Sequence, residues 1–223
     1  MLDGLKGFFA NQGLGPDFRE IAGWAGQRGF EFKREREGQG FVVDGMHDGQ
    51  RWRLEWGPSQ RAYIEGQELR LRSELGLPAD LLMLLMSRTL MESLEKQAYE
   101  EFTQSNQTQL GSATPEETRW LVLFPKIALT SAPALRGRLG GVSNVPHEGP
   151  AWLDGPLGRE LEHAFGSLLQ TGPWLLMTLK GRAYLRMAMP SAEENDVASA
   201  LRLFETACTE AVRVAASRGD AAA

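Results

Sequence analysis

The stretch RWRLEW, which runs from Arg51 to Trp56, is the clearest indication of the fold because its residues alternate strictly between charged and apolar side chains. An alternation with a period of two places successive side chains on opposite faces of a β-sheet, whereas a helix repeats its apolar residues every three or four positions. The segment therefore predicts a strand of an antiparallel sheet, with tryptophan and leucine facing a core and arginine and glutamate facing water.

Similar patterns occur on both sides of this strand. Phe30 and Phe32 alternate with charged residues, and residues 68–72 alternate leucine with glutamate or arginine. Asp48-Gly49 is a typical two-residue hairpin turn. We therefore predict an antiparallel meander of about five strands over residues 30–73, preceded by a helix over residues 16–28.

A long helix is predicted next, over residues 78–102, because Pro78 suits a first turn and leucines recur at helical spacing. Residues 103–113 are small and polar and are expected to form a linker. The chain then divides into one half over residues 1–102 and another over 114–223, or the two halves form one continuous domain.

The second half contains weaker signals. They predict a short helix from residue 114 to about 123, a mostly irregular stretch over 131–150, a helix over 156–169, a hairpin turning at Lys180-Gly181, and a last helix from Ser191 to about Ala216. The predicted fold class is α+β, in which an antiparallel β-meander packs against several helices and a C-terminal hairpin precedes a long C-terminal helix.

Composition excludes several classes of protein. The formal net charge of −5 disfavours general nucleic-acid binding, which requires a basic excess. The longest apolar run, Leu81 to Met86, is too short for a membrane span, so no membrane insertion is expected. The single cysteine, Cys208, and an N-terminus unlike a signal peptide favour the cytoplasm.

Motifs for catalysis, metal binding or nucleotide binding do not occur in the sequence. We therefore predict no cofactor, no metal site and no assigned catalytic residue. His147, which precedes Glu148 in a glycine-rich stretch, is the residue around which an unrecognised enzyme site would be built.

The best binding candidates are four arginines on the charged face of the predicted meander: Arg51, Arg53, Arg70 and Arg72. Guanidinium groups suit carboxylates and phosphates, so this face could receive an anionic group. The alternative is a ladder of cross-strand ion pairs with residues such as Glu55 and Glu68. Trp152, in the loop-rich stretch, is predicted to be an exposed contact residue.

Three functions follow from these features. The first is a non-enzymatic protein-binding module, an adaptor or chaperone-like subunit, whose partner is another protein or a second copy of the chain. The second is a sensor of a small anionic ligand that binds the arginine-lined sheet face. The third is an unrecognised enzyme that uses His147.

Overall fold

A computed structural model describes residues 17–35, 39–104, 115–130 and 132–221. These residues form one antiparallel sheet of eight strands in the order β1-β2-β3-β4-β8-β7-β5-β6. The strands are β1 (Glu31–Arg34), β2 (Phe41–His47), β3 (Gln50–Pro58), β4 (Gln67–Glu74), β5 (Met83–Ser87), β6 (Leu139–Ser143), β7 (Trp174–Leu179) and β8 (Arg182–Ala188). The predicted α+β class is confirmed.

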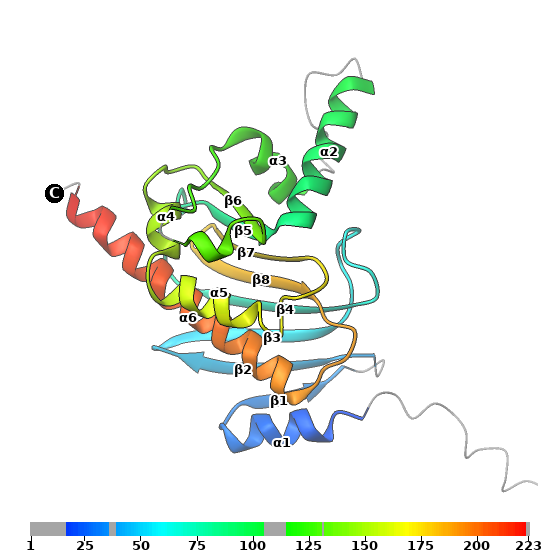
Figure 1. Cartoon of the computed structure of the whole chain (residues 1–223). Helices are drawn as coiled ribbons and strands as arrows, with labels where there is room; N and C mark the ends of the chain where they lie inside the picture. The colour runs from blue at the N-terminus through cyan, green and yellow to red at the C-terminus, as the bar shows by residue number, and fades with distance from the viewer. Residues whose placement is uncertain (1–16, 36–38, 105–114, 131, 222–223) are drawn as a thin grey trace, which may run out of the picture.

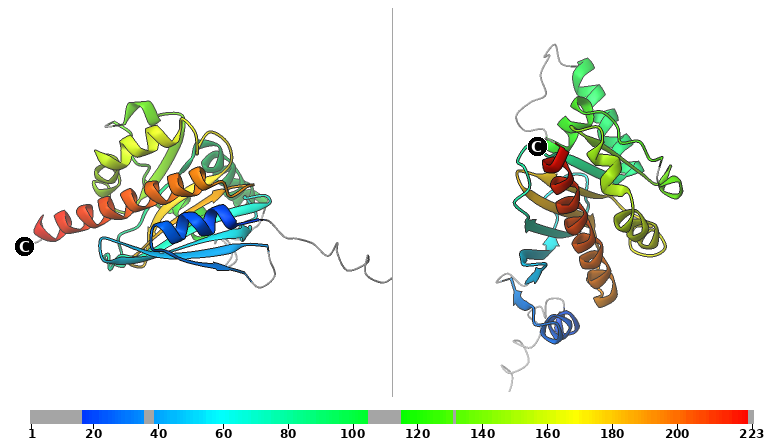
Figure 2. Two further views of the ribbon diagram at one scale, coloured as in Figure 1. Left: turned by 90° about the horizontal axis from the view of Figure 1, so that it is seen from below. Right: turned by 90° about the vertical axis from the view of Figure 1, so that its left-hand side faces the viewer.

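Helices cover the sheet unequally (Figures 1 and 2). The face that we call inner is covered by α1 (Arg19–Gln27), α4 (Glu148–Leu153), α5 (Pro156–Ala164) and the long α6 (Glu194–Ala221). On the opposite, outer face, α2 (Arg88–Gln104) and α3 (Glu116–Leu123) cover only the part near β5, β6 and β7. Among the described residues, no helix covers the outer face of β1 to β4.

The alternation from Arg51 to Trp56 is confirmed in β3. Trp52, Leu54 and Trp56 are buried on the inner face, whereas the arginines and glutamate between them are exposed or half-buried. The meander has four strands rather than about five, because residues 61–64 form a turn. That turn is closed by hydrogen bonds from Ile64 N–H to the Arg61 carbonyl and from Ser59 N–H to the Gly66 carbonyl, both 3.0 Å long.

The predicted helix over residues 78–102 is wrong in its first part. Met83–Ser87 is strand β5, which lies between β7 and β6, and the helix begins only at Arg88. All five residues of β5 are buried because helices cover the sheet on both sides there. A strand buried on both faces is a continuous apolar run, and such a run does not differ in pattern from a segment of buried helix.

A second correction concerns residues 131–150, which were expected to be mostly irregular. They contain strand β6 at the sheet edge and the start of α4. Most of the predicted linker lies outside the described residues. The short helix near residue 116, the hairpin at Lys180-Gly181 and the long last helix are confirmed.

Candidate functional site

The four predicted arginines lie on the outer face, and two of them are held in ion pairs. Arg53 forms a two-pronged contact with Asp44 on the neighbouring strand, with Nε–Oδ1 and Nη2–Oδ2 distances of 2.7 and 3.0 Å. Arg70 contacts Glu55 through Nε at 3.3 Å and donates through Nη1 to the Pro58 carbonyl at 3.0 Å. Arg53 and Arg70 therefore belong to a ladder of cross-strand ion pairs, which was the alternative to an anion-binding role.

The other two arginines, Arg51 and Arg72, line an open depression on the outer face, which we call the arginine groove. Its volume is about 970 Å³. Its charged lining consists of Arg28, Lys33, Arg51, Arg53, Arg72 and Arg182 together with Glu31, Asp44 and Glu74. The groove therefore has six basic side chains and three acidic ones.

The acidic side chains of the groove are all neutralised from within it. Lys33 pairs with Glu31 at 2.9 Å, Arg53 with Asp44 at 2.7 Å and Arg182 with Glu74 at 2.6 Å. In the described part of the chain, neither Arg51 nor Arg72 has a carboxylate within 4 Å. The basic excess therefore falls on these two guanidinium groups and on Arg28, which lies over the Trp24 ring.

Strand register explains why Arg72 is poorly compensated. Arg53 and Arg72 stand directly opposite each other across β3 and β4, where like charges destabilise a sheet. Arg70 and Arg186 face each other in the same way across β4 and β8. Buried Glu68 relieves the repulsion between Arg70 and Arg186, since its Oε1 lies 2.7 Å from Arg186 Nη1. Among the described residues, Asp44 is the one carboxylate within ion-pair distance of Arg53 or Arg72, and it pairs with Arg53.

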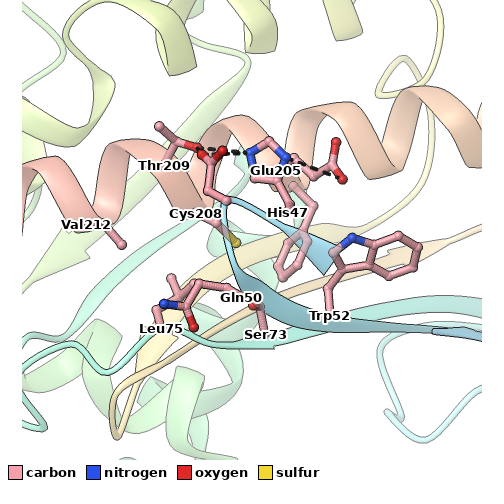
Figure 3. Close-up of a pocket in the computed structure, with 11 residues that line it drawn as sticks. His47, Gln50, Trp52, Ser73, Leu75, Glu205, Cys208, Thr209 and Val212 are labelled. Carbon is pink, nitrogen blue, oxygen red and sulfur yellow. Dashed lines mark hydrogen bonds and ion pairs between the residues drawn. The ribbon is translucent and has the colours of Figure 1, made fainter. Parts of the chain in front are cut away.

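A second, smaller cavity lies on the inner face between the β2–β3 turn and α6 (Figure 3). Its volume is about 120 Å³. Apolar groups dominate the lining, which comprises His47, Asp48, Gln50, Trp52, Ser73, Leu75, Phe204, Glu205, Cys208, Thr209 and Val212. Trp52 and Ser73 also line the arginine groove, so the two cavities lie on either side of the same strands.

His47 connects the β2–β3 turn to α6. Its Nε2 lies 3.1 Å from Thr209 Oγ1 and 3.3 Å from Asp48 Oδ2, and its Nδ1 lies 3.7 Å from Glu205 Oε1. Figure 3 shows the imidazole between Glu205 and Thr209. Thr209 in turn donates its hydroxyl proton to Asp48 at 3.1 Å. These contacts hold the turn over the end of the cavity.

Cys208, the one thiol that lines this cavity, is not activated for nucleophilic attack. Burial raises the pKa of Cys208 well above its usual value, so the side chain stays a thiol rather than a nucleophilic thiolate. Burial also raises the pKa of Glu205, an effect that the nearby His47 opposes. The hydroxyl of Thr209 lies within hydrogen-bond distance of both His47 Nε2 and the Asp48 carboxylate.

The remaining candidate residues lie elsewhere. Trp152 is fully buried, and its indole donates to the Ala207 carbonyl of α6 at 3.0 Å, so the predicted exposure is wrong. Its position in a loop-rich stretch concealed that it anchors α4 on α6. His147 is exposed beside α4 and lines neither cavity. Sequence reasoning missed Arg28, at the end of the predicted first helix, and Arg182, at the start of the second strand of the C-terminal hairpin, which join the groove only in three dimensions.

Comparisons with known proteins add little to this description. No family model and no curated protein matches the sequence. A solved structure, the crystal structure of the mycobacterial trehalose monomycolate transport factor A, TtfA, is similar with a TM-score of 0.48 and 11% sequence identity, covering 88% of this chain and 94% of that chain. A likeness of this degree assigns neither a family nor a function. In the described residues, no helix has the length and apolar character that crossing a bilayer requires.

Proposed function

We propose that this chain is a non-enzymatic binding protein that receives an acidic segment of a partner protein in the arginine groove. The observation that carries the proposal is the pair Arg51 and Arg72, which line the groove without a carboxylate partner while every acidic side chain around them is paired. A guanidinium group gains more from a carboxylate that it holds by charge-assisted hydrogen bonds than from water alone.

The shape of the groove supports an extended partner over a small ligand. Small-molecule sites usually enclose most of their ligand in a concave, largely apolar cavity. The arginine groove is open and crosses β1 to β4 as far as Arg182 at the start of β8. A peptide with several carboxylates could contact both arginines at once, which agrees with an adaptor or chaperone-like role.

We also propose that this binding takes place in a reducing compartment. The one cysteine of the chain, Cys208, is buried and unpaired, which supports a reducing compartment such as the cytoplasm. Intracellular partners with acidic segments would be attracted to the groove over a distance of about 8 Å at physiological salt.

The test measures the binding of a fluorescein-labelled peptide of Glu and Ser by fluorescence anisotropy, with a matched peptide in which every Glu is Gln. The double variant R51E/R72E is expected to weaken binding about tenfold or more, because two charge-assisted hydrogen bonds are replaced by repulsion. Binding by the unmodified chain should also weaken as salt is added.

The matched control is R119E/R159E, which makes the same change in net charge at two exposed arginines on α3 and α5, outside the groove. Equal weakening by this control would show that only net charge matters and would overturn the proposal. If citrate binds and the peptide does not, and if citrate binding is lost in R51E/R72E, then the ligand of the groove is a small anion and the proposed acidic segment is wrong.

A further inference from the structure

We propose that the N-terminus of α2 forms a second binding site, for the phosphate group of a small phosphate monoester. The site is a depression of about 620 Å³ where β5 ends, α2 begins and the α5–β7 loop passes. Its polar lining consists of Ser87, Arg88, Thr89, Arg138, Gln170 and Thr171. We call it the α2 cradle.

The first contribution to the cradle comes from the helix itself. Helix α2 has 17 residues, and its first turn contains no acidic side chain. The first backbone N–H groups of any helix lack partners within the helix, and the aligned peptide dipoles give this end a partial positive charge. A phosphate group placed there accepts hydrogen bonds and neutralises that charge.

The second contribution, and an independent one, is Ser87. This residue directly precedes α2, and a serine in that position normally accepts a hydrogen bond from the second or third N–H of the helix. Ser87 is only 7% exposed, yet its Oγ has no hydrogen-bond partner. A buried hydroxyl without a partner costs free energy, which a bound oxyanion would recover by accepting its proton.

Two arginines complete the cradle. The Arg88 N–H donates to the Arg138 carbonyl at 2.9 Å, which joins the start of α2 to the segment before β6. The Arg138 guanidinium lies over the Phe165 ring, 5.5 Å from its centroid. In the part of the chain that the structure describes, neither arginine has a carboxylate within ion-pair distance, and no Asp or Glu lines the depression.

Charge and size together identify the ligand class. A phosphate monoester carries a charge of about −1.5 to −2 at neutral pH, which matches two guanidinium groups, whereas a carboxylate carries one charge. Its oxygens can accept from the serine hydroxyl, the helix N–H groups and the arginines together. The depression also falls within the roughly 300–1,000 Å³ of typical small-molecule sites.

The test titrates inorganic phosphate into the intact chain by isothermal titration calorimetry, with chloride at equal ionic strength as the reference. Phosphate is expected to bind with a dissociation constant of about 1 mM or lower. The variant R88Q/R138Q should weaken binding about tenfold or more, while R119Q/R159Q, at two arginines outside the cradle, should leave it unchanged. Phosphate should raise the melting temperature of the unmodified chain and of R119Q/R159Q, and this rise should be absent in R88Q/R138Q.

The variant Ser87→Ala separates a ligand role from a structural one. It removes a hydroxyl that has no partner, so the free protein should melt at the same temperature or higher while phosphate binds several-fold more weakly. If the unmodified chain binds no phosphate at a phosphate concentration of about 20 mM, well above the expected dissociation constant, the proposal is overturned. Unchanged binding by a folded R88Q/R138Q variant would overturn it as well.

Discussion

At the scale of single residues, the outer face is organised by how opposing arginines are neutralised. Arg70 and Arg186 stand opposite each other and share Glu68, which is fully buried and also accepts from the Gln60 N–H at 2.9 Å. A comparable carboxylate, Glu117 in the first turn of α3, is buried and accepts from Arg61 Nε at 2.9 Å and from the Tyr63 hydroxyl. Buried carboxylates thus join the β3–β4 loop to β8 and to α3.

We expect Glu68→Ala to reduce the free energy of unfolding by about 3 kcal/mol or more, because it leaves the largely buried Arg186 guanidinium without its carboxylate partner and leaves Arg70 with Glu55 alone as a carboxylate partner. The side chains of Arg70 and Arg186 are 11% and 15% exposed. The control is Glu74→Ala on the same strand, whose ion pair with Arg182 is exposed and screened by solvent and should therefore contribute much less to stability. Urea denaturation measures both, and equal losses would contradict the expectation.

At the scale of elements, hairpins were predictable and the two strands β5 and β6 were not. Both predicted turns place a non-glycine residue and then a glycine in the left-handed region, with φ of 48° and 76° at Asp48-Gly49 and 50° and 80° at Lys180-Gly181. Such turns depend on two adjacent residues, so the sequence specifies them locally. Strand β6 contains Gly140 and Gly141, which disfavour a strand in isolation.

The structure gives a reason for glycine in β6. A Cβ added at Gly141 would lie 2.3 Å from the Leu84 carbonyl oxygen of β5, so a side chain there would force the strands apart. We expect Gly141→Ala to destabilise the fold by about 1–3 kcal/mol, as overpacking usually does.

The matched control for this substitution is Gly26→Ala in α1, where an added Cβ meets nothing within 4 Å. Alanine is a better helix former than glycine, so this variant should be neutral or more stable by up to about 1 kcal/mol. Thermal melts followed by circular dichroism measure both variants. A Gly141→Ala variant as stable as the unmodified chain would show that β5 and β6 can separate without cost.

At the scale of the whole molecule, one sheet contains strands from both halves of the sequence. Seven residue pairs join β4 to β8, and β5 from the first half lies between β7 and β6 from the second. Long α6 then crosses the inner face (Figure 1). The division into residues 1–102 and 114–223 stays a prediction. The interleaving of strands from both halves favours the alternative, a single cooperative unit.

We therefore expect one unfolding transition in urea, with tryptophan fluorescence and far-ultraviolet circular dichroism giving the same midpoint. Leu185→Ala, at a fully buried position of β8 opposite Leu71, should shift the whole transition by about 2–5 kcal/mol in both signals. Two resolved transitions, of which Leu185→Ala moves only one, would instead indicate separate domains.

The features that depend only on neighbours along the chain were predictable from the sequence. These are the period-two alternation from Arg51 to Trp56, the two hairpin turns and the amphipathic last helix. Side-chain direction and turn geometry follow from local backbone sterics, so a few adjacent residues suffice to specify them.

Features that depend on residues far apart in the sequence became clear only from the three-dimensional structure. Burial on both sides made Met83–Ser87 a strand instead of part of a helix, and packing against α6 placed Trp152 in the core. Strand register decided that Arg53 and Arg70 have carboxylate partners while Arg51 and Arg72 face an open groove. Charge pairing is set by distances across the sheet, and no pattern along one strand contains those distances.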